Sequence, residues 1–325
     1  MTAATPQIAK TAKITKTVVI VNPAARGGWP RRKWPVLEPT LRGELGAIDI
    51  RFTTRVGEGR ALAREAARRG AELVVALGGD GTVSEVAAGL LGAAEEQGLE
   101  EAPCALGYLP CATGGDLRRT LGCPEEIAEA ARRIAAGRER PLDAGRIDYT
   151  DFDGRTRRGY FLNVASCGLS GLVDHLVNDS PKALPGKAAF LLASLRATAR
   201  YKNPAVRIRL DDRPAEEQRL YVLAVANGGY FGGGMHVAPG ALIDDGLFDV
   251  VTLGDLSPLE ALQLGARIYR GEHTELPKVR TTRARSVRAE PVDRGAKVLL
   301  DVDGETPGRL PATWGVLPGA LRYRG

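Results

Sequence analysis

The sequence predicts an α/β protein of two domains: an N-terminal doubly wound parallel α/β domain and a C-terminal, mostly antiparallel β-rich domain. The chain has 325 residues, of which 44% are hydrophobic, so it can bury a full core. From residue 17 to about 140, apolar runs alternate with helical patterns, which is typical of a parallel sheet covered on both faces. Beyond Pro141 the segments are longer and β-rich, which favours antiparallel strands joined by turns.

The expected N-terminal domain covers 15–140, with the C-terminal end, 317–325, left open as an addition to it. Its predicted strands are apolar runs at 17–21, 47–53, 71–77 and 104–110. Helical patterns separate them: a helix broken by Pro35 and Pro39, an Ala/Arg-rich helix ending at Arg69, and helices at 84–97 and 125–137.

The expected C-terminal domain covers 141–316. Its predicted strands lie at 158–166, 205–212, 219–228, 246–254 and 297–305, and a last strand covers 319–324. Two helical patterns interrupt them, around Gly186 to Tyr201 and Pro258 to Tyr269.

Composition excludes several classes of protein. The net charge is +6 without a block of like charges, so nucleic-acid binding is not indicated. The four cysteines and three histidines form no zinc-type cluster. No apolar run is long enough to cross a bilayer, and the N-terminal run Val18–Val21 is too short for a signal-peptide core. We therefore expect a cytoplasmic protein with reduced thiols, soluble or peripheral to a membrane.

The strongest motif is Gly78-Gly79-Asp80-Gly81-Thr82, between an apolar strand and a helix. Glycines let the backbone approach a bulky anion, and the amides of the following helix favour phosphate. The alternative is a tight turn with a capping box formed by Thr82 and Glu85.

Two further loops follow strands in the same way. Residues 110–116 contain Thr113, Gly114, Gly115 and Asp116, and residues 21–28 begin with an Asn22-Pro23 turn. Ligands bind at the carboxyl edge of open α/β sheets, although Asp116 could simply cap a helix and Asn-Pro could be an ordinary turn.

The β-rich half carries two acidic turns. Asp244-Asp245-Gly246 precedes a strand, and Asp301, Asp303 and Glu305 surround Gly304. Such carboxylates suit a hard cation such as Mg²⁺, and alternation in an extended strand would put the last three on one face. The alternative in both places is an Asp-Gly hairpin turn.

Taken in order, these motifs resemble the diacylglycerol kinase catalytic family, in the branch of soluble bacterial lipid kinases related to sphingosine kinases and, more distantly, to NAD kinases. The matching segments run from about Val18 to the C-terminus and include VNPAARGG, Thr53 in RFTTRVGEG, GGDGTVSEVAAGL, LPCATGGDL, FLNVASCGLSG, the segment ending in ALIDDGLFDV, and LLDVDGE.

The resemblance implies a kinase with ATP in the cleft between the domains, a diacylglycerol-like lipid alcohol as acceptor, and Mg²⁺. The C-terminal domain would bind the lipid and a metal. The implied ATP-contacting residues are Asn22, Thr53, Gly78, Gly79, Asp80, Gly81, Thr82 and Thr113. A structural Mg²⁺ is implied at Asp245 with the carbonyls of Leu242 and Leu247, and a catalytic Mg²⁺ near Asp80, Asp116 and Asp303.

Glu305 is implied as the proton acceptor, with Asp303 beside it, while Asp80 competes for that role by similarity to sphingosine kinases. The second loop reads Ala112-Thr113-Gly114-Gly115-Asp116 where the family pattern is usually G-T-x-N-D, and the departure that matters is Gly115, which stands where an asparagine is usual. This leaves weakened or absent activity open, so the rivals are a nucleotide- or lipid-binding protein without catalysis and an NAD kinase. The Asn-Glu pair that usually marks NAD kinases is absent between Gly89 and Gly137.

A lipid acceptor also suggests transient contact with the inner face of the membrane. The segment 181–202 has an apolar patch with basic residues around it, which suits an anionic bilayer, although a buried helix looks the same. The acceptor, the preferred nucleotide and the oligomeric state, a homodimer included, cannot be derived from the sequence.

Overall fold

The computed structural model describes residues 16–112, 114–178, 197 and 201–325. Most of the segment 181–202, on which the expected membrane contact and one expected helix depend, therefore lies outside the described residues. No helix among those described is long and apolar enough to cross a membrane.

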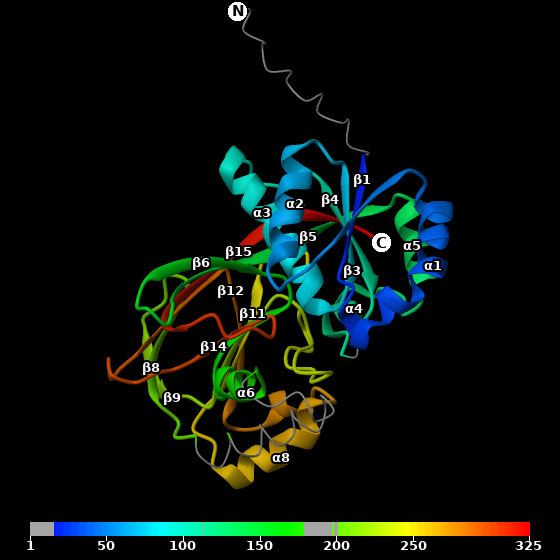
Figure 1. The fold of residues 1–325 in the computed structure, drawn as a ribbon. Helices are drawn as coiled ribbons and strands as arrows, with labels where there is room; N and C mark the ends of the chain where they lie inside the picture. The colour runs from blue at the N-terminus through cyan, green and yellow to red at the C-terminus, as the bar shows by residue number, and fades with distance from the viewer. Residues whose placement is uncertain (1–15, 113, 179–196, 198–200) are drawn as a thin grey trace, which may run out of the picture.

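The N-terminal region alternates strands and helices as the sequence predicts (Figure 1). Its elements are β1 (Thr17–Val21), α1 (Ala25–Leu45), β2 (Ile48–Phe52), α2 (Glu58–Arg68), β3 (Leu73–Gly78), α3 (Asp80–Gln97), β4 (Ala105–Pro110), α4 (Asp116–Leu121) and α5 (Ile127–Ala135). The strands pair in parallel in the order β2-β1-β3-β4. Helices α2 and α3 pack together on one face, and α1 and α5 on the other. Because both faces are covered, β3 and β4 are buried along their whole length.

Helix α1 differs from the expectation of a helix broken at Pro35 and Pro39. Its irregularity lies earlier, where Arg26, Gly27 and Gly28 have positive φ angles. The helix continues through both prolines. Its buried side chains Leu37 and Leu41 belong to the N-terminal core, and this packing offsets the backbone hydrogen bonds that the prolines remove.

The C-terminal region is β-rich, and its five-stranded sheet has the order β12-β11-β10-β7-β14 with antiparallel pairing throughout. The elements of this region are β5 (Glu139–Thr150), β6 (Thr156–Phe161), β7 (Val164–Gly168), α6 (Leu169–Asn178), β8 (Ala205–Leu210), β9 (Glu216–Arg219), β10 (Val222–Ala226), β11 (Phe248–Leu253), α8 (Pro258–Ile268), η1 (Glu272–Glu275), β12 (Val279–Ala284), β13 (Ser286–Pro291), β14 (Leu300–Val302) and β15 (Arg309–Arg324). The α/β class with a separate antiparallel sheet is thus confirmed.

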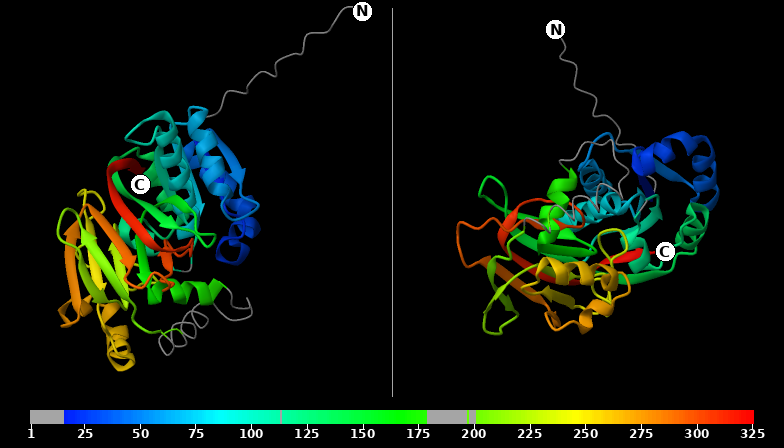
Figure 2. Two further views of the ribbon diagram at one scale, coloured as in Figure 1. Left: turned by 90° about the vertical axis from the view of Figure 1, so that its left-hand side faces the viewer. Right: turned by 90° about the horizontal axis from the view of Figure 1, so that it is seen from below.

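Two long strands join the two regions. Strand β15 pairs antiparallel with β5 over most of its length, and its end pairs in parallel with β4, with Tyr323 opposite Leu106. The parallel strands and the β13-β8-β9 strands consequently belong to one ten-stranded sheet. Figure 2 shows the red strand passing from the β-rich part into the α/β part. The predicted domain bounds stay predictions, but this shared sheet fixes the two regions against each other.

Candidate active site

Three loops that follow neighbouring parallel strands meet at one edge of the N-terminal sheet. The Asn22 side-chain amide donates to Thr82 Oγ1 over 3.1 Å. The backbone amide of Asn22 donates to Leu77 O, and that of Cys111 to Gly78 O. The structure thereby brings together the loops that the sequence singles out.

Glycine is required at the start of the central loop. A Cβ on Gly78 would lie 2.4 Å from Thr82 Oγ1, so a larger residue would displace the threonine. The alternative for this loop, a capping box formed by Thr82 and Glu85, does not form, because α3 begins about one turn earlier, at Asp80, without a side-chain cap. The Glu85 carboxylate instead accepts hydrogen bonds from the amides of Gly57 and Gly59 at the start of α2.

A cavity of about 1030 Å³ opens at this edge, and we call it the nucleotide cavity. Of the predicted ATP contacts, Gly78 does not line it and Thr113 lies outside the described residues. The others do line it: Asn22, Thr53, Gly79, Asp80, Gly81 and Thr82.

The cavity also has lining residues that sequence reasoning missed. They are the cations Arg26, Arg31 and Arg55 and the aromatic side chains Trp34 and Phe52, whose rings meet edge to face at 4.8 Å. Arg26 and Arg55 lie inside glycine-containing motifs, VNPAARGG and TTRVGEG. Arginine within a glycine-rich loop is a signal that could have identified both, because its guanidinium suits phosphate.

Two aspartates link the glycine loops to each other and to the β-rich region. Asp80 accepts from the Tyr108 hydroxyl and from the amide of Asp116. Asp116 accepts from the amide of Gly233, in the β-rich region, and pairs with Arg119 at 3.0 Å. Burial raises the pKa of Asp116; the Gly233 amide opposes the rise, and the neighbouring Asp80 adds to it.

The Asp303 carboxylate links its turn to α3 and to the segment before β7. Its two oxygens accept from the amides of Leu162, Asn163 and Val164 and from Ser84 Oγ. These four donors match the roughly four acceptor sites of a carboxylate. Burial raises the pKa of Asp303, and these hydrogen bonds oppose the rise. Because four donors already contact the carboxylate, it has little capacity left for the catalytic Mg²⁺ expected there.

The turn that carries Asp303 corrects one expectation. Asp303 and Gly304 both have positive φ angles, 49° and 87°, and Val302 and Glu305 pair across them. This is the Asp-Gly hairpin turn. An extended strand with Asp301, Asp303 and Glu305 on one face is therefore wrong.

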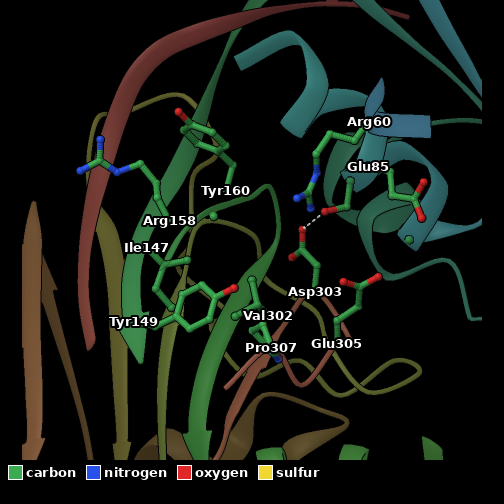
Figure 3. Close-up of a pocket in the computed structure, with 13 residues that line it drawn as sticks. Arg60, Glu85, Ile147, Tyr149, Arg158, Tyr160, Val302, Asp303, Glu305 and Pro307 are labelled. Carbon is green, nitrogen blue, oxygen red and sulfur yellow. Dashed lines mark hydrogen bonds between the residues drawn. The ribbon is translucent and has the colours of Figure 1, made fainter. Parts of the chain in front are cut away.

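The Glu305 side chain has no hydrogen-bond or ion-pair partner among the residues that the structure describes, and it lies where two pockets meet. It lines the nucleotide cavity and also a smaller pocket of about 160 Å³, drawn in Figure 3. Loss of surrounding water raises the pKa of Glu305; Glu85 adds to the rise and Arg60 opposes it. A carboxylate with raised pKa and access to a cavity is suited to accept a proton.

The other acidic turn is held by side chains of the protein itself. Asp143 is 1% exposed, and its oxygens accept from the amides of Gly246 and Gly319, each at 2.6 Å. Asp245 accepts from the amide of Leu247 and contacts the guanidinium of Arg283.

The carboxylate oxygens at this turn and on the following strand suit a cation only in part. Asp249 has a buried carboxylate oxygen without a hydrogen-bond partner among the described residues, which favours a positive charge nearby. Arg283 already supplies one, at 3.7 Å from Asp249 and in contact with Asp245. A structural Mg²⁺ held by Asp245, Leu242 and Leu247 would have to displace that guanidinium, and it stays a prediction.

Comparison with known proteins identifies the family. A model of the diacylglycerol kinase catalytic domain matches residues 16–147, and a model of the YegS C-terminal NAD kinase beta sandwich-like domain matches residues 163–324. The diacylglycerol kinase of Bacillus subtilis is 31% identical over 261 residues, which cover 80% of this chain and 79% of that protein. The chain belongs to the diacylglycerol kinase family of lipid kinases.

Further relatives agree with this assignment. A Chromohalobacter salexigens protein named "Probable lipid kinase YegS-like" is 31% identical over 87% of this chain and 88% of its own length. A crystal structure of a proposed diacylglycerol kinase from Bacillus anthracis str. Sterne superimposes with a TM-score of 0.75 at 26% identity, covering 98% of both chains. The expected family is confirmed.

Proposed function

We propose that this lipid kinase transfers the γ-phosphate of ATP to the hydroxyl of diacylglycerol or a similar lipid alcohol, giving phosphatidic acid or a related phospholipid. The observation that carries the proposal is the position of Glu305, which borders both the nucleotide cavity and a second pocket. Phosphoryl transfer between two bound substrates requires that they meet, and a proton acceptor is useful at the place where they do.

The nucleotide would bind with its phosphates at the glycine loops. Helix α3 begins at Asp80, so the first amides of that helix lie at the Gly79–Thr82 loop and favour an anion. Arg26 lines the same cavity and adds positive charge. Trp34 and Phe52 also line the cavity, and their apolar rings suit a base rather than a phosphate.

Magnesium would supply charge neutralisation of the phosphates when bound. Asp80 and Asp116 offer the carboxylate oxygens that this ion prefers, and the backbone amide of Asp116 donates to the Asp80 carboxylate. Each of the two carboxylates accepts from protein groups, but from fewer than the four donors that surround Asp303. One or two carboxylates together with substrate phosphates are the usual ligands of Mg²⁺ in kinases, so this pair fits the expected ion better than Asp303 does.

Glu305 is the better candidate for the proton acceptor. Both oxygens of Asp80 accept hydrogen bonds within the protein, whereas no hydrogen bond of the Glu305 side chain is found among the described residues. The Glu305 carboxylate is therefore available to take the proton from the acceptor hydroxyl as its oxygen attacks the γ-phosphorus.

Gly115 keeps a second candidate function open, a nucleotide- or lipid-binding protein without catalysis. The residue has a left-handed backbone, with φ at 69°, and a Cβ there would lie 3.1 Å from Arg118 Nε. The side-chain amide expected in the family is missing at this point. Loss of one hydrogen bond weakens binding by about 0.5–1.5 kcal/mol, which favours a weakened enzyme over an inactive one.

Transfer of radiolabel from γ-labelled ATP in the presence of Mg²⁺ tests the proposal. Purified protein would be given a panel of lipid alcohols in detergent micelles, together with NAD. Label in a lipid product supports a lipid kinase, and the product names the acceptor. Nucleotide binding without transfer to any lipid alcohol would favour the binding protein, and label in NAD would favour the NAD kinase.

A further inference from the structure

We propose that the smaller pocket beside Glu305, which we call the acceptor pocket, binds the polar end of the acceptor alcohol, and that Arg60 is a substrate-binding residue there. The inference rests on the proposed function and adds the place and the chemistry of the second substrate. The pocket is lined by residues of α2 and α3, of β5 and β6, and of the Asp303–Glu305 turn (Figure 3).

The two pockets are adjacent but lined by different residues. They share Gly81, Glu85 and Glu305, at the first turns of α3 and at the acidic turn. Arg60 and Tyr149 line the acceptor pocket alone, whereas Arg55 lines the nucleotide cavity alone. A group that enters the acceptor pocket therefore approaches Glu305 from the side opposite the nucleotide.

Size separates the two ligands. The nucleotide cavity, at about 1030 Å³, has room for a whole nucleotide, while the acceptor pocket, at about 160 Å³, lies below the roughly 300–1,000 Å³ of pockets that enclose drug-sized ligands. It can take a glycerol-sized headgroup but not acyl chains. The chains of a lipid would remain outside while the hydroxyl is presented to Glu305.

Most charged groups of the acceptor pocket are already engaged. Arg158 pairs with Asp148 and Glu95, and Asp303 is saturated by its four donors. Glu85 holds the amides at the start of α2. These groups form the walls of the pocket rather than its recognition surface.

Arg60 and Glu305 are the groups left for a ligand. No ion pair or hydrogen bond of the Arg60 guanidinium is found among the described residues, and its charge acts on Glu305 and on the Tyr149 hydroxyl. Figure 3 shows Arg60 and Glu305 on the same side of the pocket, facing Tyr149 across it. Glu305 accepts a hydrogen bond, and Arg60 can only donate.

This pairing selects a class of alcohol. The ligand must offer a hydroxyl to Glu305 and, a few bonds away, an oxygen that accepts from Arg60. Lipids with a glycerol headgroup meet both conditions, because the second oxygen is an ester carbonyl in diacylglycerol and a phosphodiester oxygen in phosphatidylglycerol. An alcohol with an amine beside the hydroxyl would place a cation next to Arg60 and is disfavoured.

The test compares Arg60→Gln with the control Arg55→Gln, using diacylglycerol and phosphatidylglycerol in the same mixed micelles as two acceptors. Both arginines are exposed, so neither substitution should unfold the protein. For Arg60→Gln we expect the KM for the acceptor to rise about tenfold or more, the effect of losing a hydrogen bond from a charged group. Its affinity for Mg·ADP, followed by tryptophan fluorescence, should stay within twofold of wild type. Arg55→Gln should show the reverse pattern.

Each outcome decides one question. A rise in the acceptor KM of Arg60→Gln in either arm supports the inference, and the arm with the larger rise identifies the oxygen that Arg60 contacts. If the wild type phosphorylates a lipid alcohol and Arg60→Gln keeps the wild-type acceptor KM, the inference is wrong while the proposed function stands. If the wild type phosphorylates no lipid alcohol, the proposed function fails first.

Discussion

The glycine-loop edge of the N-terminal sheet and the turn at 242–249 look alike in sequence, because both set aspartates next to glycines. Their carboxylates do different things. At the first, Asp80 lines a large cavity beside helix-end amides. At the second, Asp245 is in contact with Arg283, and the turn is tied down by the buried Asp143.

The difference shows that an acidic turn becomes a binding site only where its carboxylates keep capacity for a ligand. An internal guanidinium or a set of backbone amides uses the same lone pairs that a metal or substrate would need.

Substitution of Asp80 should have the largest effect. We expect Asp80→Asn to lower the rate of phosphate transfer at least a hundredfold, since a group that positions charge in an active site contributes about 10²–10³ in rate. Because Asp80 also bonds Tyr108 and Asp116, a small drop in melting temperature should accompany the loss. The control Asp245→Asn should stay within threefold of the wild-type rate. Retention of more than a tenth of the activity by Asp80→Asn would remove Asp80 from the mechanism.

Substitution of Asp143 should affect stability instead of chemistry. In Asp143→Asn one of the two amides, Gly246 or Gly319, loses its acceptor in a buried place. The cost is about 1–3 kcal/mol, which corresponds to several degrees in Tm. Differential scanning fluorimetry measures the shift. An unchanged Tm would show that Asp143 does not hold the turn.

Magnesium should act on the second turn only weakly. If Asp245 can exchange Arg283 for the ion, Mg²⁺ should raise the Tm of the wild type by mass action, and Asp245→Ala should abolish the rise. We expect a smaller shift than in Asp143→Asn, since the guanidinium must first be displaced. If Mg²⁺ raised the Tm of the wild type and of Asp245→Ala equally, the ion would bind elsewhere.

The smallest effect is expected at Gly115. Asparagine tolerates a left-handed backbone better than most residues, and only the flexible end of Arg118 stands in its way. Gly115→Asn should therefore fold normally and bind Mg·ADP up to about tenfold more tightly, equivalent to roughly 1.4 kcal/mol. Titration followed by fluorescence would reveal it. Weaker binding would mean that the loop is built around glycine.

Much of the fold could be predicted because its signals are local. The apolar runs of β1, β3 and β4 and the glycine-rich loops after them define a parallel sheet with a ligand edge. Strands β12 and β13 were missed because they are only half-buried. Strand β12 is rich in arginine and threonine, and β13 contains charged residues. The part of β15 that precedes the predicted strand at 319–324 contains Pro311 and Pro318, which favour a loop in sequence. Helix α6 was missed because it follows β7 without a break.

The site was predictable only in part, for a different reason. A loop can be recognised from its own residues, but the partners of a carboxylate lie far away in the chain. Asp303 is bound by Ser84, 219 positions away, and Glu85 caps α2 from α3 instead of its own helix. Arg60 sits on a helix surface with no local mark of function. Such contacts arise from tertiary packing.

The remaining contrast lies within one turn, between the saturated Asp303 and the available Glu305. Because its surroundings raise the pKa of Glu305, the folded protein is more stable with this carboxyl protonated, and that stability is lost as the pH rises through the raised pKa. Glu305→Gln should accordingly keep the wild-type Tm at neutral pH or exceed it slightly. Asp303→Asn, by contrast, should lower the Tm.

If Glu305 takes the proton where the two substrates meet, the rate of γ-phosphate transfer to a lipid alcohol, measured against pH in Glu305→Gln and in the wild type, should reveal it. We predict a fall of at least a hundredfold, in line with the 10²–10⁴ that a general base contributes, with unchanged affinity for Mg·ADP. The wild-type rate should rise with pH through a pKa above that of an ordinary glutamate, and the variant should lack this limb. A variant that keeps more than a tenth of the wild-type rate with the same pH profile would show that Glu305 is not the proton acceptor.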